Sequence, residues 1–307
     1  MACIAADVTW LIGRTPLVEL PRLSPPGTRI VAKLEGRNPS GSNKDRAALG
    51  MIQHAIRSGF LQPGGTIVEC SSGDLGLAIA MVGRRLGYRV VLTMPEWQPE
   101  SRLRLLRALG AEVVMTPADA GMRGAMARAD AIAKQTPLAV CLQAFSNRAN
   151  SLAHADTTAR EIWADTDGGV RVVVVPIGTG GTAAGCASYF RDLPVTVIGV
   201  EPAGSPLLTG GRTGPHDIPG LGAGFIPEIL VPSDLDETIA VEDREAAAGM
   251  RALAREESLL LGPASGAVVH AAATIARRPG NAGKLIVAIL PDLAERYIDH
   301  RAMSEEV

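Results

Sequence analysis

Two kinds of hydrophobic pattern alternate along the chain. Short runs rich in β-branched residues predict strands, and longer segments with apolar residues at helical spacing predict helices between them. The predicted strands cover residues 30–34, 66–68, 89–94, 112–115, 139–142, 172–175, 196–200 and 285–290. The predicted helices cover residues 45–57, 75–86, 100–109, 123–134, 151–164, 182–190, 244–256 and 267–276. This alternation predicts an α/β fold of doubly wound parallel sheets covered by helices.

The longest irregular stretch runs from Pro202 to Pro232 and is rich in glycine and proline. A loop of this length is either functional or a peripheral surface connection, and the residues alone leave both readings open. At roughly 150 residues per domain, the 307 residues predict about two domains. No repeat runs along the chain, so a solenoid is not expected.

Composition narrows the class of function. Hydrophobic residues make up 47% of the chain, and 30 basic residues against 32 acidic ones leave a net charge of -2. This balance disfavours a nucleic-acid or membrane partner and favours a small-molecule site. No apolar run approaches the roughly 18 residues that span a bilayer, and the first residues lack a signal-peptide pattern. We therefore expect a cytoplasmic protein.

The cysteines and histidines are not spaced as metal ligands or as a disulfide framework would require. The four cysteines lie far apart, and the five histidines are equally scattered. Neither a disulfide framework nor a metal site is therefore expected. The cysteines are Cys3, Cys70, Cys141 and Cys186.

Three polar, glycine-containing turns carry candidate chemistry. NPSGSNKDRAA (38–48) places Lys44 at a helix start, where it is either a solvated surface lysine or a group held near a domain cleft. ECSSGDLG (69–76) joins a strand to a helix, whose free N–H groups can bind a carboxylate or phosphate. PIGTGGTAAG (176–185) lets the main chain wrap an anion closely. Because it lacks the lysine of a Walker loop, it fits a monophosphate cofactor better than a nucleoside triphosphate.

Further matching stretches span almost the whole chain in unbroken order: IGRTPLVEL, VAKLEGRNPSGSNKDRAAL, FSNRANSLAH, GTGGT, IPGLGAGFIPEIL, GPASGAV and ILPDLAERY. With the three turns, they resemble the fold-type II pyridoxal-phosphate enzymes, and within them the cysteine synthase (O-acetylserine sulfhydrylase) family, most closely its B-type members. The resemblance implies a tryptophan synthase β-like fold and a homodimer. It also implies a larger cofactor domain, residues 1–38 and 146–307, and a smaller mobile substrate domain, residues 39–145.

The resemblance also implies a role for each turn. Lys44 would form a Schiff base with the aldehyde of pyridoxal 5'-phosphate and later move the α-proton of the amino-acid substrate. The substrate would be an O-activated serine, O-acetylserine or O-phosphoserine, which passes through an aminoacrylate before a nucleophile adds. The phosphate would be held by Gly178, Thr179, Gly180, Gly181 and Thr182, and the substrate carboxylate by the loop of Ser71, Ser72, Gly73, Asp74 and Leu75.

Three positions depart from the family pattern. Asp74 replaces an asparagine of the family that donates to the phenolic oxygen of the cofactor. Its carboxylate must therefore be protonated, be turned away from that oxygen, or belong to a site that alters the electron distribution of the cofactor. Ala264 stands where a serine of the family faces the pyridine nitrogen of the cofactor. Ser265, one residue on, would bind the cofactor in its place only if the backbone is shifted. Ala144 replaces a substrate-binding glutamine, and Gln143, displaced by one, would point to the other face of a strand.

These departures leave alternatives open. One is a specialised enzyme that adds an amine to make a diaminopropionate precursor, which Leu75 and the stretch IPGLGAGFIPEIL favour. Another is a catalytically weak homologue that binds the cofactor and acts as a regulator. Near the site we interpret Cys70 as a buried packing residue, and we expect Arg296 in PDLAERY to pair with an acidic neighbour.

Overall fold

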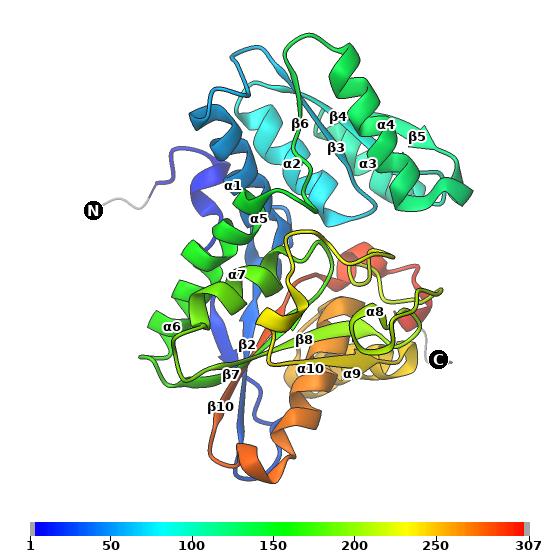
Figure 1. Cartoon of the computed structure of the whole chain (residues 1–307). Helices are drawn as coiled ribbons and strands as arrows, with labels where there is room; N and C mark the ends of the chain where they lie inside the picture. The colour runs from blue at the N-terminus through cyan, green and yellow to red at the C-terminus, as the bar shows by residue number, and fades with distance from the viewer. Residues whose placement is uncertain (1–3, 304–307) are drawn as a thin grey trace.

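A computed structural model describes residues 4–303, and Cys3 lies outside this range. The chain forms two lobes, each built around its own parallel sheet (Figure 1). Among the described residues, no helix has both the length and the apolar character needed to cross a bilayer. The fold is therefore α/β with two parallel-sheet lobes, as the sequence predicts.

The larger sheet has six strands in the order β1-β2-β10-β7-β8-β9. Five of them run parallel, and only β1 pairs antiparallel, with β2. The sequence prediction missed β1 and β9, because β1 is a three-residue edge strand and β9 is only partly buried. The strands are β1 (Leu17–Glu19), β2 (Arg29–Leu34), β7 (Val170–Pro176), β8 (Thr196–Pro202), β9 (Glu237–Val241) and β10 (Leu285–Leu290).

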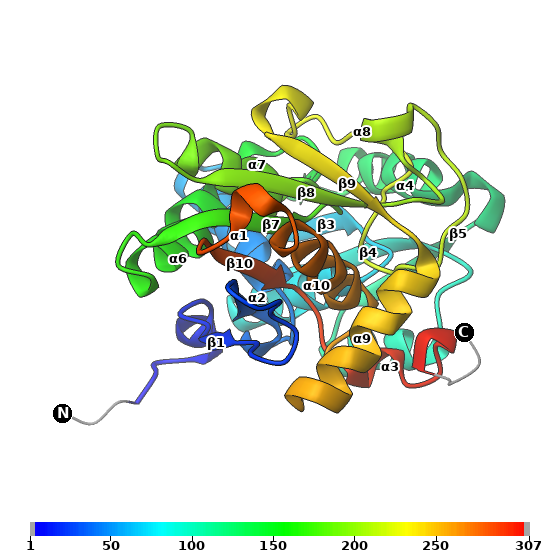
Figure 2. The ribbon, with the colours of Figure 1, turned by 90° about the horizontal axis from the view of Figure 1, so that it is seen from below.

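Helices cover both faces of this sheet, because consecutive side chains of a strand point to opposite faces. Even-numbered residues of β7, such as Val172 and Val174, pack with α9 (Asp243–Glu257) and α10 (Pro263–Ala276). Odd-numbered ones, such as Val173 and Val175, pack against α6 (Arg160–Asp165) and α7 (Gly181–Phe190). Figure 2 shows α9 and α10 on one side of the sheet.

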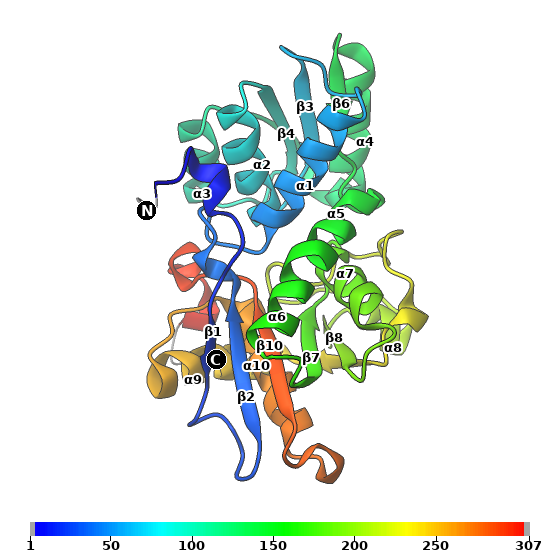
Figure 3. The same cartoon turned by 90° about the vertical axis from the view of Figure 1, so that its left-hand side faces the viewer.

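The smaller sheet has four parallel strands in the order β5-β4-β3-β6. Three helices share a hydrophobic core with one face, and α4 packs on the other (Figure 3). The strands are β3 (Thr66–Cys70), β4 (Arg89–Pro95), β5 (Glu112–Thr116) and β6 (Ala139–Cys141). The helices are α1 (Lys44–Arg57), α2 (Asp74–Arg85), α3 (Glu100–Ala108) and α4 (Gly121–Gln135).

Two predicted helices differ from the structure. The helix predicted over 151–164 is divided into α5 (Arg148–Ala153), a π-helical segment η4 (His154–Ala159) and α6. The helix α10 begins four residues earlier than predicted, at Pro263, because proline is well suited to the first helical position. The sequence GPASG therefore forms the start of a helix, and Ala264 and Ser265 lie in its first turn.

The stretch 202–232 is largely irregular: between the end of β8 and the start of η5 it contains one short helix, α8 (Leu207–Gly210). Single turns of 3-10 helix occur elsewhere: η1 (Val8–Leu11), η2 (Glu35–Arg37), η3 (Ala118–Ala120), η5 (Pro232–Asp234), η6 (Pro279–Asn281), η7 (Ala294–Tyr297) and η8 (Arg301–Met303). The strands of the smaller sheet all lie within residues 39–145, while the domain boundaries themselves stay a prediction.

Candidate active site

Three neighbouring strands of the larger sheet end at one edge and bring the sequence motifs together. The strands β2, β10 and β7 lie side by side and run parallel, so the segments after them meet. The segment after β2 leads to Lys44, and its Asn43 N–H donates to the carbonyl of Pro291, after β10, at 3.1 Å. The side-chain amide of Asn43 also donates to Thr182 Oγ1 at 2.9 Å, joining the glycine-rich turn that follows β7.

Lys44 occupies the first position of α1 and is partly buried. Its Nζ donates to Asn43 Oδ1 at 2.9 Å. Burial lowers the pKa of Lys44, although the carboxylates of Asp74, Asp292 and Glu35 oppose the shift. A lowered pKa increases the fraction of neutral amine, which is the form that attacks a carbonyl carbon and accepts a proton.

The turn from Gly178 to Thr182 is a cradle made of main chain. Gly180, with φ of 84°, is the residue before α7, whose first N–H groups lack intrahelical partners. A β-carbon on Gly178 would lie 2.3 Å from the carbonyl oxygen of Gly220, and one on Gly181 would lie 2.0 Å from Asn150 Oδ1. The closely packed glycines and the N–H groups of α7 fit a phosphate, and the nearby amine fits an aldehyde. The residues therefore suit pyridoxal phosphate.

The loop of Ser71, Ser72 and Gly73 is held by its own hydrogen bonds and by α3. Ser71 Oγ accepts from the N–H groups of Gly73, at 3.2 Å, and Gly76, at 2.9 Å. The carbonyl oxygen of Ser72 accepts from the guanidinium of Arg102 at 2.8 Å. Arg102 of α3 is thus engaged with the loop.

Asp74, the first residue of α2, forms an ion pair with Arg296 of η7, with 2.8 Å between Oδ1 and Nη1. This pair links the lobe of the smaller sheet to the segment after β10, and it supplies the acidic neighbour expected for Arg296. The carboxylate is directed to a guanidinium, so the structure favours the turned-away alternative for Asp74. Leu75 is buried in the hydrophobic core around α1 and α2.

Ser265 is fully buried, and its hydroxyl donates to Asp292 Oδ1 at 2.5 Å. The N–H groups of Ala264 and Ser265 donate to the same carboxylate, at 3.2 and 3.0 Å. Asp292 thus caps α10 from the segment after β10. Burial raises the pKa of Asp292 to about 6, with Asp74 adding to the rise.

Gln143 follows β6 in a left-handed conformation, with φ of 54°, so the alternation of strand side chains used to orient it does not apply. Its side chain is exposed and reaches toward Asp130 Oδ1 at 3.5 Å. The neighbouring Ala144 is buried, and its N–H donates to Glu69 Oε2 at 3.0 Å. The structure therefore directs the Gln143 side chain to α4 and not to the loop of Ser71.

Sequence reasoning missed the polar residues that join the motifs. Asn150 donates to the carbonyl of Ala144 at 2.8 Å and to Thr179 Oγ1 at 3.2 Å. Glu69 is buried, with a pKa raised to about 7 by burial, and accepts from the N–H groups of Cys70 and Ala144. Cys70 is buried beside it, and desolvation raises the pKa of its thiol, which fits a packing role. The family stretch FSNRAN contained the only signal for Asn150.

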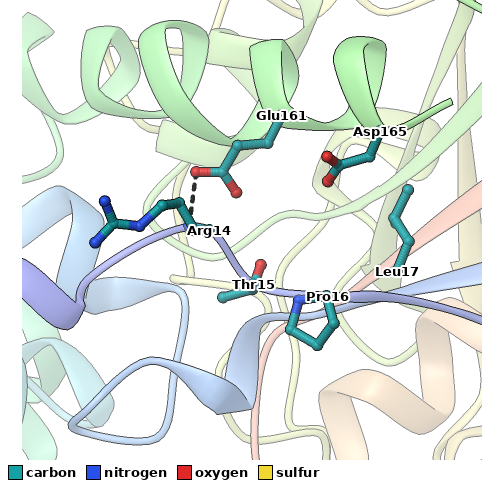
Figure 4. Close-up of a pocket in the computed structure, with 6 residues that line it drawn as sticks. All are labelled: Arg14, Thr15, Pro16, Leu17, Glu161 and Asp165. Atoms are coloured by element: carbon teal, nitrogen blue, oxygen red, sulfur yellow. Dashed lines mark hydrogen bonds between the residues drawn. The ribbon is translucent and has the colours of Figure 1, made fainter. Parts of the chain in front are cut away.

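A cavity of about 420 Å³ lies beside the start of β1 and is lined by Arg14, Glu161 and Asp165 (Figure 4). The Glu161 carboxylate is already occupied, because it pairs with Arg46 at 2.7 Å and with Lys33 at 2.9 Å. Arg46 lies on α1 two residues after Lys44. We therefore assign this ion-pair cluster to anchoring α1.

A second cavity, of about 580 Å³, is lined by Asn38, Arg102, Leu293 and Arg296. Two of these side chains hold the loop of Ser71 to Asp74, through the carbonyl of Ser72 and the carboxylate of Asp74. The cavity therefore adjoins the side chains that hold this loop.

Comparison with known proteins agrees with this geometry. The model of the pyridoxal-phosphate dependent enzyme family matches residues 8–292. The chain is 43% identical to cysteine synthase of Haemophilus influenzae, with 96% of each chain covered. Cysteine synthase of Entamoeba histolytica superposes with a TM-score of 0.93 at 38% identity, covering 97% of this chain and 90% of that one. O-ureido-L-serine synthase superposes with a TM-score of 0.95 at 37% identity, covering 99% of this chain and 96% of that one. This chain therefore belongs to the pyridoxal-phosphate dependent enzymes, within the cysteine synthase family.

Proposed function

We propose that the protein catalyses β-replacement on O-acetyl-L-serine, with sulfide as the acceptor and L-cysteine and acetate as the products. The observation that carries this proposal is the position of Lys44, a partly buried amine of lowered pKa joined through Asn43 to the Gly178–Thr182 cradle. The cysteine synthases among its relatives, and the O-ureido-L-serine synthase among its structural neighbours, support a serine-derived substrate.

The reaction exchanges one bond at the β-carbon for another. The Cα–H proton is removed, the Cβ–O bond breaks, and acetate leaves with the electron pair. Sulfide then forms a Cβ–S bond, and a proton returns to Cα. Bound pyridoxal phosphate supplies the electron sink for the negative charge at Cα.

Each motif has a part in this proposal. Lys44 holds the cofactor and moves the proton at Cα, since a neutral amine can act as nucleophile and as base. The N–H groups of the cradle and the hydroxyls of Thr179 and Thr182 hold the phosphate. Ser71, Ser72 and Gly73 bind the substrate carboxylate, and Leu75 is buried in the hydrophobic core around α1 and α2. Gln143 is exposed and would need a loop movement to reach a substrate.

We also propose that residues 39–145 form a smaller mobile domain that closes over the substrate and excludes water. The Asp74–Arg296 ion pair supports this, because it joins the proposed smaller domain to the segment after β10, so a movement between the two domains would change it. A cytoplasmic homodimer is proposed on the family resemblance alone. A solution molar mass equal to one chain would contradict the dimer.

An activity assay tests the proposed function. Purified holoenzyme given O-acetyl-L-serine and sulfide should release acetate and form cysteine in equal amounts, and Lys44→Ala should form neither. Lys284→Ala is the control, because the Lys284 ammonium donates a hydrogen bond to Asn281, the last residue of η6, and lies outside the site. Product only with an amine acceptor would instead support the amine-adding enzyme. A protein that binds the cofactor but releases no acetate from O-acetyl-L-serine with any acceptor would support the catalytically weak regulatory homologue.

A further inference from the structure

Asn43 lies between the amine of Lys44 and the cradle of Gly178–Thr182, and it is only 1% exposed. Its Oδ1 accepts from Lys44 Nζ at 2.9 Å, and its Nδ2 donates to Thr182 Oγ1 at 2.9 Å. A charged amine can only donate, so the amide oxygen faces Lys44 and the amide nitrogen faces Thr182. The main-chain N–H of Asn43 is bonded as well, to the carbonyl of Pro291. Each polar contact of this side chain therefore goes to a group that the proposed function uses.

We propose that Asn43 is a positioning residue, which holds the Lys44 amine at a fixed place relative to the phosphate cradle. The inference rests on the proposed function, since it deepens the part that Lys44 has there. The cofactor carries its aldehyde and its phosphate on one small molecule, so the amine and the cradle must be held at matching positions. Asn43 is the one side chain among the described residues that bonds both Lys44 Nζ and a residue of the cradle.

Lysine needs such a partner because of its flexibility. The amine of Lys44 is carried by a four-carbon chain, whose rotamer freedom is lost when the amine is held for reaction. Asn43 Oδ1 takes one N–H of the neutral amine and leaves the lone pair free. The lone pair is the part that attacks a carbonyl carbon or accepts a proton. The amide therefore holds the amine without consuming its reactive electrons.

The hydrogen bonds continue beyond Thr182 into the packed interior. Thr182 Oγ1 lies 3.3 Å from His154 Nε2, and His154 Nδ1 lies 2.9 Å from Thr158 Oγ1. Burial lowers the pKa of His154 to about 3, so its imidazole is uncharged at neutral pH. These contacts anchor the Asn43 amide to α7 and η4 without adding a charge beside Lys44.

The charge on Lys44 is governed by groups on other elements. Burial favours the neutral amine, whereas the carboxylates of Asp74, Asp292 and Glu35 favour the ammonium. Two of these carboxylates are themselves paired with arginines. Asn43 contributes no charge, so replacing it separates two effects. Aspartate adds a further carboxylate and keeps an acceptor for Lys44, while leucine adds no charge and removes the acceptor.

The test is the rate at which the full chain, stripped of cofactor, binds added pyridoxal phosphate, followed by absorbance as a function of pH. In Asn43→Leu, which keeps the branched arrangement of heavy atoms, binding should be roughly 3- to 10-fold slower at every pH, as for the loss of one hydrogen bond. In Asn43→Asp, binding should be slow at neutral pH, because the added carboxylate raises the pKa of Lys44, and should recover as pH rises.

Asn281→Leu is the matched control for these variants. Asn281 also accepts from a lysine, Lys284 at 3.0 Å, but it lies in η6, outside the site. Its binding rate should follow that of the parent at every pH. Thermal unfolding of each cofactor-free variant shows whether it is folded.

Binding by Asn43→Leu at the parent rate overturns the inference. Slow binding by Asn43→Asp that persists at high pH overturns it as well, because a purely structural defect would not be relieved by removing a proton from Lys44. This second result decides the question if Asn43→Leu does not fold. A parent enzyme that binds the cofactor at Lys44 but makes no cysteine would refute the proposed function and leave the inference standing. Cofactor bound at another lysine would refute both.

Discussion

At the scale of single residues, the unusual side chains of the site are explained by partners far away in the sequence. Asp74 is separated from Arg296 by 222 positions, and the two meet only because α2 lies against the segment after β10. Sequence reasoning could identify Asp74 as a departure and could list its possible states. It could not choose among them, because the choice depends on a contact between the two lobes.

The Asp74–Arg296 ion pair should stabilise the folded protein. We predict that Asp74→Asn lowers the free energy of unfolding by about 1.5 to 3 kcal/mol, as for a hydrogen bond between charged groups. Both side chains are largely buried, at 10% and 16% exposed, so solvent screens the pair weakly. Denaturant unfolding at constant cofactor concentration measures the change.

The matched control is Asp234→Asn, which breaks the exposed pair with Arg191. Surface pairs of this kind contribute between about 0 and 1 kcal/mol. Equal decreases in the free energy of unfolding of Asp74→Asn and Asp234→Asn would contradict a stabilising role of the Asp74–Arg296 pair.

At the scale of elements, the least predictable feature is the π-helical segment η4. The hydrophobic pattern of residues 151–164 is that of one continuous helix, and nothing local signals the interruption. The structure gives a tertiary reason, since α7 packs closely on this segment through Gly185. A β-carbon on Gly185 would lie 2.4 Å from the carbonyl oxygen of Ser151 and 2.8 Å from the β-carbon of His154. A pattern within one segment cannot report such a contact.

The close approach predicts the effect of a single methyl group. Gly185→Ala should destabilise the protein by about 1 to 3 kcal/mol, because either α7 or η4 must shift. The cofactor affinity should also fall, since α7 begins with the phosphate cradle. Thermal unfolding of the apoprotein and cofactor titration measure the two effects. Gly280→Ala, which meets open space, is the control and should change neither.

At the scale of the whole molecule, most of the architecture could be predicted from the chain. All eight predicted strands are present, and the α/β class with parallel sheets is confirmed. The strand order and the two unpredicted strands depend on pairing between distant segments. The same holds for the site: its motifs were visible in the sequence, whereas the linking residues Asn43, Asn150 and Glu69 act through contacts between loops.

The buried His154 should make the free energy of unfolding depend on pH. Desolvation lowers its pKa to about 3 from an ordinary value of 6.5, so the native state excludes a proton that the unfolded chain binds below pH 6.5. The contribution to stability is therefore complete above pH 6.5 and is lost as pH falls toward 3. Between about pH 7 and pH 5 this single group removes about 2 kcal/mol.

Replacement of the imidazole isolates this effect. His154→Gln removes the titrating group and retains side-chain atoms that can bond Thr158 and Thr182. Its free energy of unfolding should fall by about 2 kcal/mol less than that of the parent over that pH range. The exposed His54→Gln serves as control and should follow the parent. Parallel pH profiles for parent and His154→Gln would show that His154 is not the excluded proton site.

The central claim is that Lys44 is the residue that holds the cofactor. The chain has four lysines, at positions 33, 44, 134 and 284, so the claim has few alternatives. Borohydride reduction of the holoenzyme turns a bond between a lysine and the cofactor aldehyde into a stable linkage, which peptide mass mapping then locates. We predict one cofactor mass per chain, on the peptide that contains Lys44. A cofactor mass on another lysine, or none in enzyme saturated with pyridoxal phosphate, would contradict the account.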